Sequence, residues 1–292
     1  MSVILSNIKY VIKAVTLFSA LFSFCLRAET SISVEVKGNG QPVLLIPGLM
    51  SDSRVWQETA ELLGSNFQYH FVSVAGFAGK EAISDISLEQ VHTDLSHYLE
   101  SAKLENVIVI GHSMGGFLAY KLALSQPKHI AKAISVDGLP FIAPIFTRTN
   151  HTRAADVMHY AKQMKTRYHL ANNKSFEALI TASLPIQANT PEAQTRVFNM
   201  AKDSEPLSVG NFIYDLMTTD LRERLKETSV PLLLLGASGA FKADAEHQAI
   251  ESLYKGQFDK NLNAKVVMNR EARHFIMFDD ISWLVAQLKL FI

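Results

Sequence analysis

One serine in this chain has the sequence surroundings of an activated nucleophile. Residues 111–115 read G-H-S-M-G, which fits the pattern G-x-S-x-G with Ser113 at its centre. The motif directly follows an apolar run at 107–110 and precedes a helical pattern at 114–126, so it predicts a sharp turn between a buried strand and a helix. The glycines let such a turn close without Cβ clashes, and the N-terminus of the following helix favours negative charge. The pattern therefore favours nucleophilic catalysis by the Ser113 hydroxyl over a simple glycine-rich packing turn.

The strands that would hold this turn are visible as short apolar runs. Besides 107–110, these runs lie at 43–46, 69–74, 131–136, 231–235 and 264–268. Continuous apolar runs separated by helical patterns are typical of parallel strands that are buried on both faces. An alternating segment at 31–37, followed by the turn sequence G-N-G, predicts a hairpin strand. We therefore expect an α/β protein with a mostly parallel central sheet flanked by helices.

With this turn at its centre, the sequence resembles the α/β-hydrolase superfamily, and within that superfamily it is similar to the serine esterases. Besides G-H-S-M-G, the resemblance rests on the segment I-P-G-L at 46–49, which is similar to the family's oxyanion loop but has Pro47 where histidine is usual. It implies that the backbone N–H groups of Leu49 and Met114 bind a developing oxyanion. It also implies a catalytic histidine in the loop between the last strand and the terminal helix, which in this chain is His274.

The acid that would orient His274 has two candidates. The family's commonest position follows the run at 231–235, but the first carboxylate there is Asp244, which has the surroundings of a helix start. Asp137 ends the run at 131–136, and some relatives take their acid from that strand. We therefore expect Asp137 to hold the imidazole tautomer and to stabilise the imidazolium, with Asp244, or neither residue, as the alternatives.

A long segment without strand patterns interrupts the alternation. Residues 140–229 contain helical patterns around 151–170, 175–183, 191–202 and 207–227. Such a connection is far longer than an ordinary loop, so we expect a helical cap over the carboxyl edge of the sheet, inserted after the sixth strand. A separate helical domain is the alternative. The methionines and phenylalanines of the segment favour a partly apolar underside that would accept a small apolar acyl ester.

The first 28 residues have the layout of a secretory signal peptide. Two lysines precede an apolar run at 14–26 that contains no acid, and Ala28 offers a small residue for cleavage. The run is shorter than the roughly 20 residues that a membrane-spanning helix requires. We therefore expect a periplasmic or secreted bacterial protein that covers residues 29–292 and has no stable membrane insertion after cleavage. A retained membrane anchor is the alternative.

The composition and the absence of two motifs argue against several kinds of partner and cofactor. The 28 basic and 28 acidic residues balance, which argues against a nucleic-acid partner. The single cysteine, Cys25, can form neither a disulfide framework nor a thiolate metal site within the chain. Neither H-E-x-x-H nor G-x-x-x-x-G-K occurs, so we predict no metal and no cofactor.

The sequence as a whole favours an exported serine ester hydrolase that forms an acyl-enzyme intermediate. Carbon–carbon bond hydrolysis, acyl transfer and perhydrolysis are alternatives within the same fold. A non-catalytic ligand-binding protein is the alternative from another class.

Overall fold

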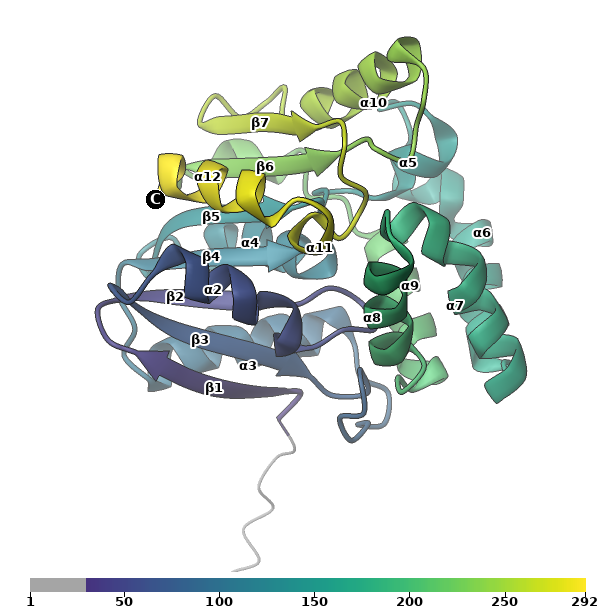
Figure 1. Ribbon diagram of the computed structural model, residues 1–292, viewed down its shortest axis with the longest axis horizontal. Coiled ribbons are helices and arrows are strands. Elements are labelled where there is room, and N and C mark those ends of the chain that lie inside the picture. Colours follow the sequence, from purple (N-terminus) through teal and green to yellow (C-terminus); the bar gives the residue numbers. More distant parts are fainter. Residues whose placement is uncertain (1–29) are drawn as a thin grey trace, which may run out of the picture. The chain divides into compact units, whose positions relative to one another are not determined.

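Seven strands form one sheet in the part of the chain that the structure describes (Figure 1). The computed structural model describes residues 30–292, and the predicted signal peptide at 1–28 lies outside them. The strands are β1 (Ile32–Gly38), β2 (Gln41–Ile46), β3 (Phe67–Val74), β4 (Val107–His112), β5 (Ile130–Val136), β6 (Leu232–Ala237) and β7 (Ala264–Asn269). Each of the predicted apolar runs therefore lies in or overlaps a strand.

The order of the strands confirms the predicted fold class and corrects one local prediction. The order is β1-β3-β2-β4-β5-β6-β7, with β1 antiparallel to β3 and every other pair of neighbours parallel. The predicted hairpin is wrong, because β3 lies between β1 and β2. A Cβ atom on Gly38 would lie 2.5 Å from the carbonyl oxygen of Phe67, and one on Gly40 would lie 2.1 Å from that of Asn66. The start of β3 thus packs directly against the turn and separates the two strands that the turn connects.

The sheet is buried on both faces, as continuous apolar strands require. In β2, Val43 and Leu45 belong to one core cluster and Leu44 and Ile46 to the other, and all four are fully buried. Burial of each such side chain contributes about 1.5–3 kcal/mol relative to an exposed one. The helices that cover the two faces are α2 (Gln57–Leu63) and α12 (Ile281–Phe291) on one side, and α3 (Leu88–Ser101), α4 (Met114–Ser125) and α10 (Asp244–Gly256) on the other.

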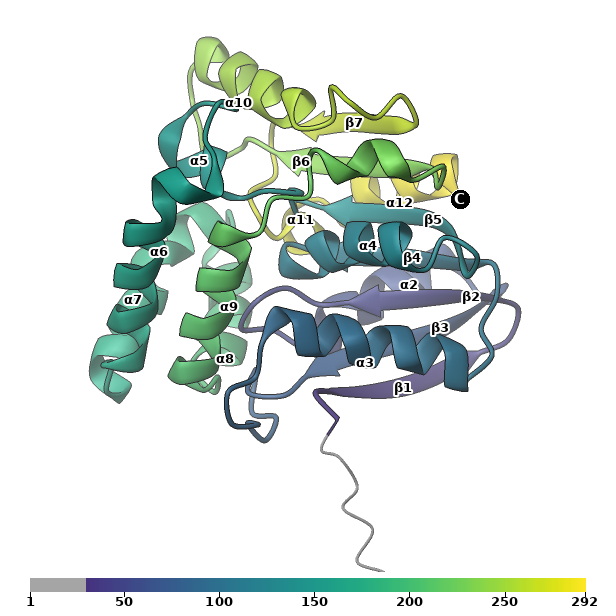
Figure 2. The same cartoon turned by 180° about the vertical axis from the view of Figure 1, so that it is seen from behind.

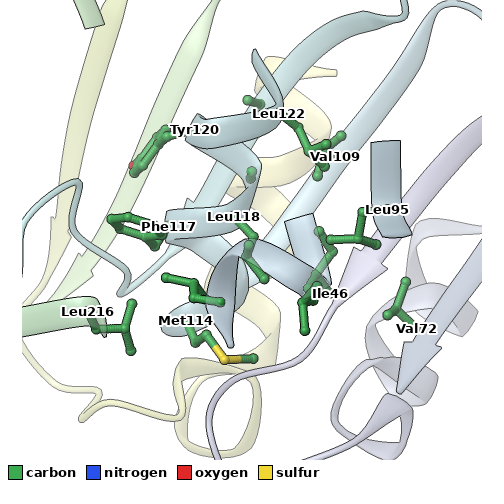
Figure 3. Packing of buried hydrophobic residues seen from close by; sticks show 14 of the residues in the cluster. Ile46, Val72, Leu95, Val109, Met114, Phe117, Leu118, Tyr120, Leu122 and Leu216 are labelled. Carbon is green, nitrogen blue, oxygen red and sulfur yellow. The ribbon is translucent and has the colours of Figure 1, made fainter. Parts of the chain in front are cut away.

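Helix α4 is enclosed almost completely by other elements. Met114, Phe117 and Leu118 are at most 1% exposed. Figure 3 shows their side chains packed between Ile46 of β2 and Leu216 of helix α9 (Pro206–Thr218). A helix held on all sides keeps its N-terminus in a fixed position, and that N-terminus follows Ser113.

Five α-helices and no strand occupy the chain between β5 and β6. Figures 1 and 2 show α6 to α9 beyond the carboxyl ends of the parallel strands. The helical segment follows the fifth strand of the described sheet and not the sixth, because only four strands precede β5 in residues 30–292. The elements are α5 (Ala143–Thr147), α6 (Ala154–His169), α7 (Asn173–Gln187), α8 (Pro191–Ala201), α9 and the 3-10 turn η2 (Arg224–Glu227).

The single helical pattern predicted at 207–227 is divided in the structure. Helix α9 ends at Thr218, and Thr219 has extended backbone angles of φ −105° and ψ 116° before the chain reaches η2. Residues 31–292 form one compact unit, to which this helical segment belongs. Within the described residues, no helix is both long enough and apolar enough to cross a membrane.

Candidate active site

Ser113 lies at the turn between β4 and α4 in a strained backbone conformation. Its φ is +52° and its ψ is −114°, a region that a residue with a side chain occupies only when its surroundings enforce it. The N–H of Ser113 donates a hydrogen bond to the carbonyl of Val136 over 2.9 Å. A Cβ atom on Gly111 would lie 2.0 Å from the carbonyl oxygen of Gly115, and one on Gly115 would lie 2.3 Å from that of Ile46. Only glycine fits at either position, which is the steric reason for the G-x-S-x-G pattern.

The two predicted oxyanion donors lie on the two chain segments that meet at Ser113. A Cβ atom on Gly48 would lie 3.1 Å from Cβ of Ser113, so the loop after β2 passes directly beside the serine. Leu49 follows in that loop, and Met114 is the first residue of α4. In residues 30–292 neither amide donates a hydrogen bond to a protein acceptor. Leu49 lies outside the helices and strands, and Met114, as the first residue of α4, has no acceptor within its own helix. Both N–H groups are therefore available to an incoming oxygen atom.

The structure brings His274 together with Asp137 and not with Asp244. The distance from Nδ1 of His274 to Oδ2 of Asp137 is 2.7 Å. The Asp137 side chain is 7% exposed and that of His274 is 25% exposed. Asp244 is the first residue of α10, and its carboxylate is 88% exposed and pairs with Arg270 at 3.4 Å. Of the two candidates, only Asp137 can orient the imidazole in this arrangement.

The other oxygen of Asp137 is also engaged. Oδ1 accepts hydrogen bonds from the N–H of Ala237 and from the hydroxyl of Tyr254, each over 2.9 Å. The sequence reasoning did not identify Tyr254 or Ala237. Tyr254 follows Ile250 and Leu253 on the buried side of α10. The sequence could have indicated this role, because a tyrosine on an apolar helix face is buried and its hydroxyl usually finds a hydrogen-bond partner.

His112, which the sequence analysis did not assign as a base, supports the backbone of His274. Its Nε2 donates to the carbonyl oxygen of His274 over 3.0 Å. Its ring centroid lies 4.6 Å from that of His274 and 4.4 Å from that of Phe275. Burial, and then the repulsion that two neighbouring imidazolium groups would exert on each other, hold the pKa of His112 well below its ordinary value, so this imidazole stays neutral. The Oγ of Ser113 makes no hydrogen bond to His274 among the described residues, and such contacts commonly tighten only when substrate binds.

The end of α7 and the connection from α7 to α8 are bonded to the loop that carries His274. The N–H of Phe275 donates to the carbonyl of Gln187 over 2.8 Å. The Arg273 guanidinium donates to the carbonyl of Ala188 over 3.0 Å, and the side-chain amide of Asn189 donates to the carbonyl of Glu271 over 2.7 Å. The helical segment thus contributes directly to the position of the histidine loop.

The methionine and phenylalanine side chains expected on the underside of the helical segment are divided between core and surface. Phe146 and Met158 are exposed, at 51% and 40%. Met164 and Phe198 are partly buried. The remaining side chains are buried: Phe141, Phe176, Met200, Phe212 and Met217. Beside Ser113, the partly buried Leu49 and Met50 add apolar surface on the loop after β2.

No group of three or more histidine, cysteine, aspartate or glutamate side chains within residues 30–292 is arranged to hold a metal ion.

Residues 43–287 match the model of the alpha/beta hydrolase family. This match confirms the superfamily that the sequence resembles.

Known proteins similar to this chain are esterases and related hydrolases. Over 208 residues, the chain is 28% identical to the pimeloyl-[acyl-carrier protein] methyl ester esterase of Vibrio cholerae, a match that covers 69% of this chain and 76% of that protein. A thermophilic esterase from Thermogutta terrifontis has a similar structure, with a TM-score of 0.72, 19% identity and coverage of 92% of this chain and 95% of that one. The enol-lactonase from Burkholderia xenovorans gives a TM-score of 0.70 at 15% identity, with coverage of 89% and 95%. At these identities the two structures support the fold alone.

Proposed function

This chain belongs to the alpha/beta hydrolase family, and we propose that it is an exported carboxylic ester hydrolase that acts through Ser113, His274 and Asp137. The observation that carries the proposal is the bond of 2.7 Å between His274 and Asp137 beside the strained turn of Ser113. A histidine whose Nδ1 proton is held by a carboxylate presents its other nitrogen as a base. The combination of a strained serine and a carboxylate-held histidine favours catalysis over ligand binding alone.

The proposed reaction forms and then hydrolyses an acyl-enzyme. Oγ of Ser113 attacks the carbonyl carbon of the ester while Nε2 of His274 takes the hydroxyl proton. The N–H groups of Leu49 and Met114 bind the oxyanion, and each such donor commonly contributes about 3–4 kcal/mol to the transition state. The imidazolium gives its proton to the leaving alcohol oxygen as the carbon–oxygen bond breaks. A water molecule, deprotonated by His274, then attacks the acyl carbon. As the bond between that carbon and Oγ of Ser113 breaks, the imidazolium returns its proton to Oγ and the carboxylic acid leaves.

We propose a small ester with an apolar acyl group as the substrate. The Vibrio cholerae relative acts on a methyl ester according to its name, which supports carboxylic ester chemistry. Leu49 and Met50, which follow Gly48 in the loop beside Ser113, supply apolar surface there. Each buried methylene of the acyl chain would gain about 0.8 kcal/mol.

A fluorophosphonate probe tests the proposed nucleophile directly, because labelling requires an activated serine. Mass spectrometry of the labelled protein (residues 29–292) should find the adduct on the peptide that contains Ser113. Ser113→Ala should abolish labelling and reduce the hydrolysis of short p-nitrophenyl esters to the background rate, while the circular dichroism spectrum stays unchanged. Ser101→Ala, at an exposed position at the end of α3, should label as the unchanged protein does. Labelling at another serine, or more than a few per cent of the activity in Ser113→Ala, would exclude the proposed role.

The proposed export has a separate test. The full chain of 292 residues, expressed in a Gram-negative host, should be recovered from the periplasm with Glu29 as its first residue. Recovery of uncleaved chain in the membrane fraction would support the retained anchor instead. Recovery of uncleaved chain in the cytoplasm would refute export.

A further inference from the structure

The Asp137 carboxylate is held on three sides by groups from three different elements. The histidine loop after β7 contributes His274, which bonds to Oδ2. Strand β6 contributes the N–H of Ala237 and helix α10 contributes the hydroxyl of Tyr254, both of which bond to Oδ1. Asp137 itself follows β5 with a φ of +52°, a left-handed value that aspartate adopts more readily than most residues. The three hydrogen bonds from these neighbouring elements hold the direction of its carboxylate.

The position of Tyr254 is fixed by close packing. The residue is 6% exposed. Its ring passes directly over Gly236, where a Cβ atom would lie 2.6 Å from Cδ1 of Tyr254 and 2.6 Å from Sδ of Met268. The absence of a side chain at residue 236 thus leaves the space through which the tyrosine reaches Asp137.

The hydroxyl of Tyr254 acts as a donor to this carboxylate. Burial, and then the charge of Asp137, raise the pKa of Tyr254 well above its ordinary value, so the hydroxyl keeps its proton. An ionised carboxylate can only accept hydrogen bonds. The proton on the tyrosine oxygen therefore points at Oδ1, and the bond is charge-assisted.

We propose that Tyr254 is a positioning residue of the triad, which fixes the Asp137 carboxylate so that Oδ2 faces Nδ1 of His274. This inference rests on the proposed function, since it assigns Tyr254 a role in orienting the proposed base. The acid at the end of β5 lies away from the family's commonest position after β6. In this chain, β6 and α10 instead supply the two donors that hold it.

Tyr254→Phe removes the hydroxyl and keeps the ring. Using a p-nitrophenyl ester, we expect kcat to fall roughly 10- to 100-fold, the range that corresponds to one hydrogen bond to a charged group, with KM little changed. The acid limb of the kcat/KM profile should move to higher pH, because a carboxylate with one donor fewer concentrates its charge and stabilises the imidazolium more strongly. Tyr69→Phe is the matched control, because Tyr69 is equally buried and loses one hydroxyl bond, to the carbonyl of Gly64, away from the site. Its kinetics should equal those of the unchanged protein.

A double-mutant cycle separates positioning from general stability. If Tyr254 acts through Asp137, Tyr254→Phe should have no further effect on kcat in the Asp137→Asn background. Gly236→Ala supplies a second variant in case Tyr254→Phe does not fold, since the added methyl group would displace the tyrosine ring and should reproduce the loss of kcat and the shift in the pH profile. Unchanged kinetics in folded Tyr254→Phe or folded Gly236→Ala would overturn the inference. A fall in kcat without the upward shift, or with additive effects in the cycle, would also overturn it, because it would indicate only a structural role. Failure of the unchanged protein to label at Ser113 would instead refute the proposed function.

Discussion

Replacing Asp137 by asparagine should impair turnover through the tautomer of His274. Oδ1 of Asp137 accepts two hydrogen bonds, from Ala237 and Tyr254. The carbonyl oxygen of an asparagine would keep these two donors, so its NH2 group must take the place of Oδ2, 2.7 Å from Nδ1 of His274. That NH2 group can only donate. Nδ1 must then lose its proton and Nε2 must carry it, which leaves no base facing Ser113.

The expected loss of kcat is large because the two donors to Oδ1 leave the asparagine side chain no alternative orientation. The corresponding substitution in a serine triad lowers kcat by about 10⁴, which is about 5.4 kcal/mol of transition-state stabilisation. Asp244→Asn is the matched control: Asp244 is 88% exposed and pairs with Arg270 at 3.4 Å, a surface contact worth at most about 1 kcal/mol to stability. Its kcat should stay within about twofold of that of the unchanged protein.

The assay is the release of p-nitrophenol from a short ester at saturating substrate, with thermal melting to confirm that both variants fold. A kcat for Asp137→Asn within tenfold of the unchanged protein would refute the tautomer argument. A larger loss in Asp244→Asn than in Asp137→Asn would transfer the acid to the family's more usual position.

Two further predictions concern substrate and pH. Catalytic efficiency, measured as kcat/KM over p-nitrophenyl esters from acetate to octanoate, should rise with each added methylene for several carbons. A flat or falling series would indicate that the helical segment restricts the site. Phosphate monoesters should not turn over. The free energy of unfolding should decrease as the pH falls below 6.5, because the unfolded chain binds a proton at His112 that the folded chain, with its lowered pKa, does not. His112→Gln should remove about 1.1 kcal/mol per pH unit, averaged over pH 6.5 to 5, from this dependence as measured by urea unfolding. An unchanged slope would show that His112 titrates equally in both states.

The sequence predicted those features that local pattern determines. Residues 43–46 and 107–110 are apolar on both faces, which identified two central parallel strands, and the glycines around Ser113 identified the turn by steric necessity. The local pattern could not predict which strand pairs with β1. Alternation and a glycine turn are equally compatible with a hairpin and with a strand that pairs elsewhere, and the register with β3 is decided by tertiary contacts.

The supporting groups of the candidate site also depend on tertiary contacts. Tyr254 and Asp137 are 117 residues apart in the chain, and His112 and His274 are 162 residues apart. No spacing rule joins such pairs. The end of α9 at Thr218 was missed for another reason, since the residues that follow keep apolar side chains at helical spacing while Thr219 is extended.

The bonds between the α7–α8 connection and the histidine loop bear on how this protein could diversify. Gln187, Ala188 and Asn189 each hold a residue within the segment 271–275. An exchange of the helical segment for that of a homologue would therefore also replace the supports of His274. Changes in this segment that alter substrate selectivity would thus also act on turnover through the position of His274, and we expect laboratory evolution of a new substrate range to conserve the geometry of this short connection.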